Sequence, residues 1–144
     1  MYNIDDIMDM LSWNNSEEIQ SKGIELAKNV RSLNVFIQPI NQFHGKDVWD
    51  NCAKILVEKS DEILEYYLYQ LFEWLKDMNW PGAFIIYERL KKFLKVEKLA
   101  AIIDSLVKKK DKESIDFGVL SGFLENEKLK KAFCEETIKL LEKA

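Results

Sequence analysis

Two strongly apolar helical stretches, joined by a short turn, occupy the middle of the chain between Ser60 and Lys95. In the first stretch apolar side chains recur every three or four positions and form two adjacent rows: Leu64, Leu68, Leu71, Leu75 and Met78, and Ile63, Tyr67, Leu71, Trp74 and Met78. Only a narrow polar face remains, made by Glu62, Glu65, Tyr69, Glu73 and Lys76. A helix with so wide an apolar surface needs neighbours on two sides, which predicts a place in the middle of a stack of helices.

The turn between the two stretches contains Pro81, followed by Gly82. Proline has no backbone N–H and is accepted in the first turn of a helix, while the residue before it is kept out of the helical conformation. We therefore expect Trp80 to fall at or just before the N-cap of the second helix. We also expect Asp77 or Asn79 to accept hydrogen bonds from the unpaired amides of Gly82 and Ala83.

The residues around this turn carry a resemblance to a known family. Residues 72–82 read Phe-Glu-Trp-Leu-Lys-Asp-Met-Asn-Trp-Pro-Gly and resemble the W-L-x-D-x-N-W-P-G/A signature of a family of uncharacterised bacterial domains. The similarity covers roughly residues 46–95. It implies a HEAT-like fold, and because some such domains lie beside toxin genes it also implies an immunity-like role. The family brings no established activity or catalytic residues.

Helical spacing continues on both sides of this central pair. We expect further helices over residues 4–13, 16–30, 47–56, 96–110, 113–124 and 126–141. Ser16, Asp47 and Asn126 are the predicted N-caps of three of them, because their side-chain oxygens accept bonds from unpaired amides. Residues 32–46 lack a helical period. We expect them to form a long apolar connection that packs at the edge of the stack or offers a surface to a partner.

The sequence thus predicts one all-α domain over residues 1–144. Its eight expected helices form antiparallel pairs of about 35 residues, which favours a short HEAT-like right-handed solenoid. Residues 11–16 faintly resemble residues 75–81, about 64 positions later, and both stretches place Trp and Asn in a turn between helices. An irregular helical bundle is the alternative.

Composition and charge limit the classes of function. The chain has 47% hydrophobic and 32% charged residues, no apolar run near the roughly 18 residues of a membrane span, and an acidic start unlike a signal peptide. We therefore expect a cytoplasmic protein without membrane contact, in which Cys52 and Cys134 are buried, reduced thiols. The net charge of −4 argues against nucleic acid as a partner. The one feature that favours nucleic-acid binding is a basic segment over residues 89–112, with nine basic and three acidic residues.

No sequence motif for a metal, a cofactor, a phosphate-binding loop or an activated nucleophile is present, so we expect neither catalytic residues nor a cofactor. The leading hypothesis is a non-enzymatic, protein-binding helical-repeat domain, whose sharper form is an immunity-like protein that neutralises a bacterial toxin. The candidate binding residues are the turn and helix-end residues of types common in interfaces: Trp80, Asp77, Asn79, Arg89, Trp49 and Tyr69.

Two alternatives stay open. A small nucleic-acid-processing or hydrolytic enzyme on a HEAT-like scaffold would place perturbed carboxylates in a pocket near Asp77, Glu88 and Arg89. A homo-oligomer would use the apolar segment of residues 36–43. Trp74 is expected in the core because it lies on the apolar stripe. The positions of Trp13, Trp49 and Trp80 near helix ends leave their burial open, although packing is favoured.

Overall fold

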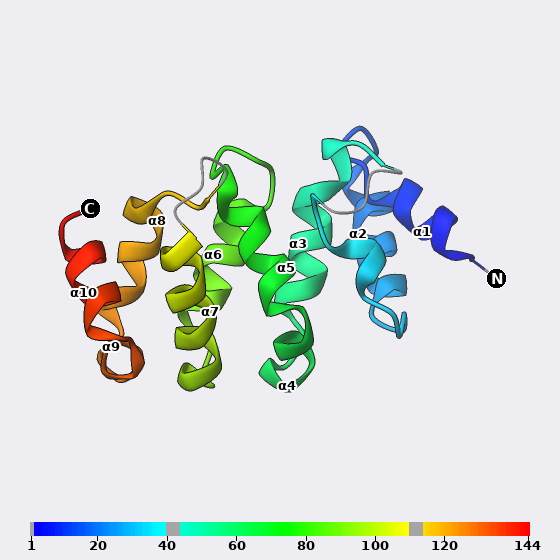
Figure 1. Ribbon diagram of the computed structural model, residues 1–144. Helices are drawn as coiled ribbons and strands as arrows, with labels where there is room; N and C mark the ends of the chain where they lie inside the picture. Colours follow the sequence, from blue (N-terminus) through cyan, green and yellow to red (C-terminus); the bar gives the residue numbers. More distant parts are fainter. Residues whose placement is uncertain (1, 40–43, 110–113) are drawn as a thin grey trace.

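The fold is described from a computed structural model of residues 2–39, 44–109 and 114–144. Over these ranges every regular element is helical, which confirms the predicted all-α class. The helices follow one another along an elongated molecule, with the N- and C-termini at opposite ends (Figure 1). Across the same ranges each helix is too short or too polar to cross a lipid bilayer.

The elements are mostly short. The first half contains α1 (Ile4–Met10), α2 (Glu17–Ala27), η1 (Asn34–Phe36), η2 (Lys46–Val48), α3 (Trp49–Val57), α4 (Asp61–Leu64), η3 (Glu65–Tyr67), α5 (Leu68–Glu73) and η4 (Trp74–Lys76), where η denotes a 3₁₀ helix. The second half contains α6 (Ala83–Lys91), α7 (Val96–Lys109), α8 (Phe117–Ser121), η5 (Gly122–Glu125), α9 (Glu127–Ala132) and α10 (Glu135–Glu142).

Most predicted helix starts are confirmed. The side chains of the predicted N-caps Ser16 and Asn126 each accept a hydrogen bond from an amide in the first turn of the helix that follows. The side chain of Ser60 does the same at the start of α4. The prediction for Asp47 was wrong. A 3₁₀ turn that begins after Gly45 precedes α3, so Asp47 lies inside that turn, and its backbone carbonyl accepts from the amide of Trp13 at 2.9 Å.

The long central helix expected over residues 60–78 is interrupted. At Tyr67 the backbone leaves the helical region, with φ −116° and ψ 7°, and 3₁₀ turns separate and end its α-helical parts. Leu64, Leu68, Leu71 and Leu75 are buried as predicted, and so is Trp74. The second predicted row is only partly correct, because Ile63 is 44% exposed.

The last expected helix is also two helices, α9 and α10. Phe133 between them is extended, with φ −73° and ψ 152°. The amide of Cys134, which begins α10, donates to the Asp104 carboxylate on α7 at 3.2 Å. The break therefore coincides with a contact made by a helix some thirty residues earlier in the chain.

The connection of residues 32–46 packs inward where the structure describes it. Leu33, Phe36, Ile37 and Gln38 are buried, and η1 contacts α3. This agrees with the packed-edge alternative for those residues. The rest of the apolar segment, residues 40–43, lies outside the described residues.

Several long-range hydrogen bonds recur at a nearly constant separation along the chain. Residue pairs 30 to 32 positions apart join α2 to α3 and the α3–α4 turn, these two in turn to α6, α6 to α8, and α7 to the start of α10. The helices α2, α3, α6 and α7 therefore each contact an element found about one such interval later. The two similar turns noted in the sequence precede α2 and α6, which are two intervals apart.

Candidate interaction surface

Four of the six predicted binding residues meet at one place, the turn between η4 and α6. Trp80, which is half-buried, packs edge-on against Trp49 of α3, with ring centroids 5.6 Å apart. Trp49 in turn packs against Trp74 at 6.2 Å. Asp77 and Asn79 belong to the same turn. Trp49 is 7% exposed, so two of the three uncertain tryptophans pack here, whereas Trp13 is 51% exposed.

The signature residues of this turn bond mainly to one another. The indole N–H of Trp74 donates to the carbonyl of Pro81 at 2.8 Å, and the Asp77 carboxylate accepts from the amide of Asn79 at 2.8 Å. The predicted bonds from Asp77 or Asn79 to the start of α6 were wrong, because the amide of Ala83 donates to the carbonyl of Trp80 instead. The turn closes on itself before α6 begins.

Arg89 lies near the other end of α6 and is engaged in the fold. Its Nη2 lies 2.6 Å from the Asp61 carboxylate and donates to the carbonyl of Lys59, and its Nε donates to the carbonyl of Val57. Both charged side chains are largely buried, at 18% and 16% exposure. The second Asp61 oxygen accepts from the amide of Leu94 at 2.9 Å. Arg89 and Asp61 thus tie the end of α3 and the start of α4 to the C-terminal part of α6 and to the α6–α7 connection.

Tyr69 stands apart from the other predicted residues. It lies on α5, is 41% exposed, and its hydroxyl and ring contact Lys109 of α7. One turn earlier Tyr66 is 80% exposed. Between these helices the Glu65 carboxylate accepts from Lys98 at 2.7 Å and Lys95 at 3.1 Å. These hydrogen bonds, with Lys98 the stronger, lower the pKa of Glu65 below its ordinary value.

The residue that sequence reasoning missed is Phe84. It is 63% exposed on α6 and lines a hollow of about 610 Å³ between α3 and α6. The floor of the hollow is apolar, from Val57 and Ile85, and its rim carries Glu88, Arg89 and Lys92. A signal was present in the sequence. Phe84 directly follows the inward Ala83, so helical geometry places it outside the buried row that continues at Ile86 and Leu90.

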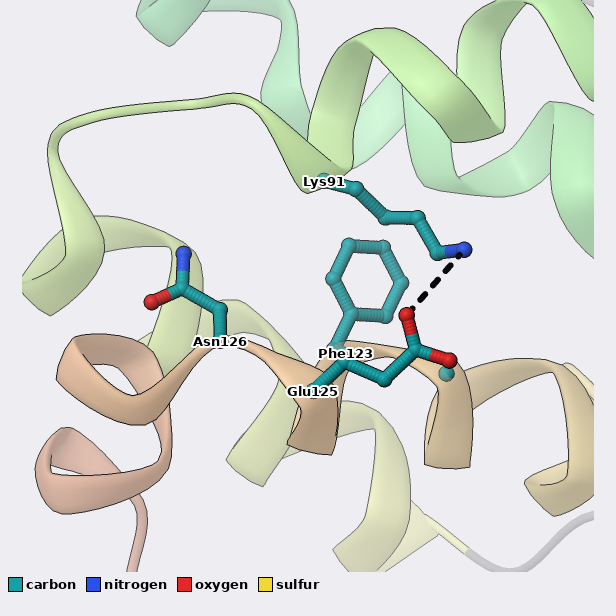
Figure 2. Close-up of a pocket in the computed structure, with 5 residues that line it drawn as sticks. Lys91, Phe123, Glu125 and Asn126 are labelled. Carbon is teal, nitrogen blue, oxygen red and sulfur yellow. Dashed lines mark ion pairs between the residues drawn. The ribbon is translucent and has the colours of Figure 1, made fainter.

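A smaller pocket of about 220 Å³ lies between the C-terminal end of α6 and η5 (Figure 2). In the figure Lys91 and Glu125 point toward each other across the Phe123 ring, with Nζ 3.9 Å from the carboxylate. Lys91 also pairs with Glu88 at 3.5 Å and lies over the Tyr87 ring. This pocket is therefore spanned by contacts that join α6 to the C-terminal helices.

The three residues named for the enzyme alternative lie at two places in the structure. Glu88 and Arg89 line the hollow beside Phe84, but Asp77 lies in the turn at the other end of α6, and the Arg89 guanidinium is held by Asp61. Among the described residues, no group of three or more His, Cys, Asp or Glu side chains is placed to hold a metal ion.

Both cysteines are free, and they differ in environment. Burial raises the pKa of Cys52 to about 12. Cys134 is exposed, which corrects the prediction that it is buried, and a hydrogen bond to Asp104 raises its pKa. Each thiol therefore carries less thiolate at neutral pH than an ordinary cysteine, which disfavours a nucleophilic role.

Comparison with known proteins identifies a family. Residues 45–142 match the family model of DUF5071, a domain of unknown function. The matched region is more than half of the chain, so the chain belongs to this family. The searches of curated proteins and of solved structures gave no match. The matched region contains the tryptophan turn and the hollow beside Phe84, and it leaves α1 and α2 outside.

Proposed function

For this member of the DUF5071 family we propose a non-enzymatic, protein-binding function, with Phe84 as the anchor of the binding surface. The observation that carries the proposal is the exposed Phe84 ring beside an apolar hollow that a side chain of a partner can fill. Large aromatic residues next to such hollows are typical anchors of protein interfaces. The mixed charges of Glu88 and Lys92 at the rim match the polar border of interfaces.

The proposal includes a HEAT-like arrangement of the helices, as a short right-handed solenoid. Support comes from the hydrogen bonds that recur at 30 to 32 residues, because a solenoid places each repeat against the next. The contacts of α3 with α6, of α5 with α7 and of α7 with α9 join alternate helical segments in the same way. In such a stack the α3–α6 hollow lies between equivalent helices of adjacent repeats.

The sharper proposal is that the partner is a toxin of the same bacterium, which the chain neutralises by masking it. It rests on the resemblance of residues 72–82 to domains found beside toxin genes. Such a role requires tight binding and no chemistry, in keeping with a surface whose charged groups are paired within the fold, as Arg89 is with Asp61.

The test is co-expression of the intact chain with the product of each adjacent gene, followed by gel filtration and by measurement of growth. We expect one product to form a stoichiometric complex and to inhibit growth when expressed alone. Phe84→Ser should weaken that complex at least tenfold, since a central aromatic anchor contributes about 2 kcal/mol or more. Leu94→Ser is the matched control, because Leu94 is 83% exposed but lies outside the hollow.

The melting temperatures of both variants should stay close to that of the wild type, because neither side chain is buried. Equal weakening by the two substitutions, or none by Phe84→Ser, would remove the anchor role. Absence of any complex across the adjacent gene products would remove the toxin partner.

A further inference from the structure

We infer that the face formed by α1 and α2 binds a basic amphipathic helix of a protein partner. This inference rests on the proposed protein-binding function. It concerns a different surface, at the N-terminal end of the chain, and it specifies the chemistry of the partner that binds there. The surface lies outside residues 45–142, the region that the family model matches.

The first observation is a hollow between the two helices that is lined by both apolar and polar side chains. It measures about 440 Å³ and is lined by Tyr2, Asp6, Asp9, Met10, Asn15 and Ile19. Tyr2 and Ile19 are each 44% exposed, so large apolar side chains stand open to solvent on both sides of the hollow. An apolar row of a partner helix can bury both of them, which is how a helix binds in a groove.

The second observation is the charge around the hollow. Residues 2–21 contain five acidic residues and no Lys or Arg, and the acidic side chains, Asp5, Asp6, Asp9, Glu17 and Glu18, are all exposed. The nearest basic side chain is Lys22, whose Nζ lies 2.6 Å from the Tyr2 hydroxyl and over its ring. His44 lies 3.6 Å from one Asp9 oxygen. Two of these carboxylates, Asp6 and Asp9, line the hollow itself, and none of its lining residues is basic.

The third observation is that the face is held in place before anything binds. Asn51 is only 3% exposed, and its side-chain Nδ2 donates to the backbone carbonyl of Leu11 at 2.7 Å and to the Gln20 side-chain oxygen at 2.8 Å. Gly23 lets the two helices approach closely, since a Cβ there would lie 2.8 Å from Cβ of Met10. A preformed face loses little entropy on binding.

The charge decides between classes of occupant. Nucleic acid and anionic membrane surfaces carry negative charge and would be repelled by the acidic side chains around the hollow. A protein helix with Lys or Arg beside an apolar row complements both the Asp6 and Asp9 carboxylates and the exposed Tyr2 and Ile19 side chains. The hollow thus fits a basic amphipathic helix better than nucleic acid or an anionic membrane.

The probes are two fluorescein-labelled helical peptides with the same leucine pattern, one with Lys and the other with Glu at its polar positions. Binding to the intact chain is followed by fluorescence anisotropy at increasing salt. We expect the Lys peptide to bind, with affinity that falls as salt rises, and the Glu peptide not to bind. Amide NMR shifts caused by the Lys peptide should map to Tyr2, Asp9 and Ile19.

Two variants test the two parts of the surface. Asp9→Asn should weaken the Lys peptide severalfold and reduce the salt dependence, while Ile19→Ser should weaken it without changing the salt dependence. Both positions are exposed, and circular dichroism checks that the helices remain. The matched control removes charge at the other end of the chain: Glu135→Gln and Glu136→Gln, on α10, should leave affinity unchanged.

Equal binding of both peptides, no binding of the Lys peptide, or equal weakening by the α10 control would overturn the inference. Phe84→Ser separates it from the proposed function. If Phe84→Ser abolishes peptide binding and Asp9→Asn leaves the affinity unchanged, the peptide occupies the α3–α6 hollow. In that case only the inference about α1 and α2 fails. Failure of the proposed function shows separately, as the absence of a complex with any adjacent gene product.

Discussion

The indole N–H of Trp74 donates a hydrogen bond to the carbonyl of Pro81 at 2.8 Å, across the turn that carries the family-like signature. The Trp74 side chain is fully buried, so this bond fixes the turn from inside the core. Trp74 and Pro81 therefore share one structural role, which is to hold the turn before α6 closed. The hydrogen bond also leaves the Trp74 N–H with no capacity to bind a partner.

Replacement of Trp74 by Phe should therefore destabilise the fold. The change removes the donor, leaves the Pro81 carbonyl without this partner and opens a small cavity, so we expect a loss of about 1–3 kcal/mol in the free energy of unfolding. Urea denaturation measures it. Trp13→Phe is the matched control, because Trp13 is 51% exposed, and a comparable loss there would contradict the assignment.

Gly82 should tolerate no side chain. Its φ of +83° is in the left-handed region, and a Cβ would lie 2.8 Å from the Trp74 ring and 2.9 Å from Ala53. We expect Gly82→Ala to lower the free energy of unfolding by about 2 kcal/mol or more, since backbone strain and overpacking add. Gly45→Ala is the comparison, because its Cβ would meet only the flexible Asp47 carboxylate; equal effects in thermal melts would refute the argument.

Arg89 should matter for stability and not as an exposed binding residue. Lysine cannot reproduce its contacts to Asp61 and to the carbonyls of Val57 and Lys59 at the same time. We expect Arg89→Lys to cost about 1–3 kcal/mol in chemical denaturation. Arg31→Lys, at an exposed position, should be neutral. A stable Arg89→Lys protein that fails to bind its partner would reverse this interpretation.

The Glu65 carboxylate should make stability sensitive to acid. Its pKa in the fold is lowered by Lys98 and Lys95, so its stabilising effect is present above the unfolded value of about 4.5 and is lost as the pH falls through the folded pKa. Wild type should exceed Glu65→Gln in stability at pH 7, and the difference should shrink below pH ~4.5. Glu62→Gln, at an exposed position, should show no such pH-dependent difference.

The two thiols should react at different rates. Cys134 is exposed and should react with a disulfide reagent in the native state, whereas Cys52, buried with a pKa of about 12, should react only after unfolding. Asp104→Asn should speed the labelling of Cys134 at pH 8, because the Asp104 carboxylate raises the pKa of that thiol. Cys134→Ser leaves Cys52 alone for comparison, and rapid native labelling of that variant would contradict the burial of Cys52.

Sequence periodicity predicted the parts of the fold that depend on neighbours three or four residues away. The buried row Leu64, Leu68, Leu71 and Leu75 is confirmed, and the N-caps at Ser16 and Asn126 are too, because a cap bonds to its own first turn. The same reasoning did not predict the break at Tyr67. The backbone leaves the helical conformation there, two residues after Glu65, whose carboxylate bonds to Lys98 of α7.

The candidate site was predicted only in part for the same reason. Turn residues such as Trp80 and Asn79 were selected by type, but their exposure depends on Trp49, which lies in another helix. Arg89 has the residue type of an interface anchor, and nothing near it in the sequence shows that Asp61, 28 positions earlier, neutralises it. Phe84 was overlooked because the hollow beside it forms only when α3 and α6 lie side by side.

By itself, then, the sequence determined an all-helical chain, its main apolar stripe and most of its helix starts, because those features arise from contacts within one or two turns of a helix. The tertiary structure alone decided the long-range charge pairs, such as Arg89 with Asp61, and the hollows that lie beside exposed apolar side chains. Those properties depend on residues about thirty positions apart, whose proximity the packing of successive helices creates.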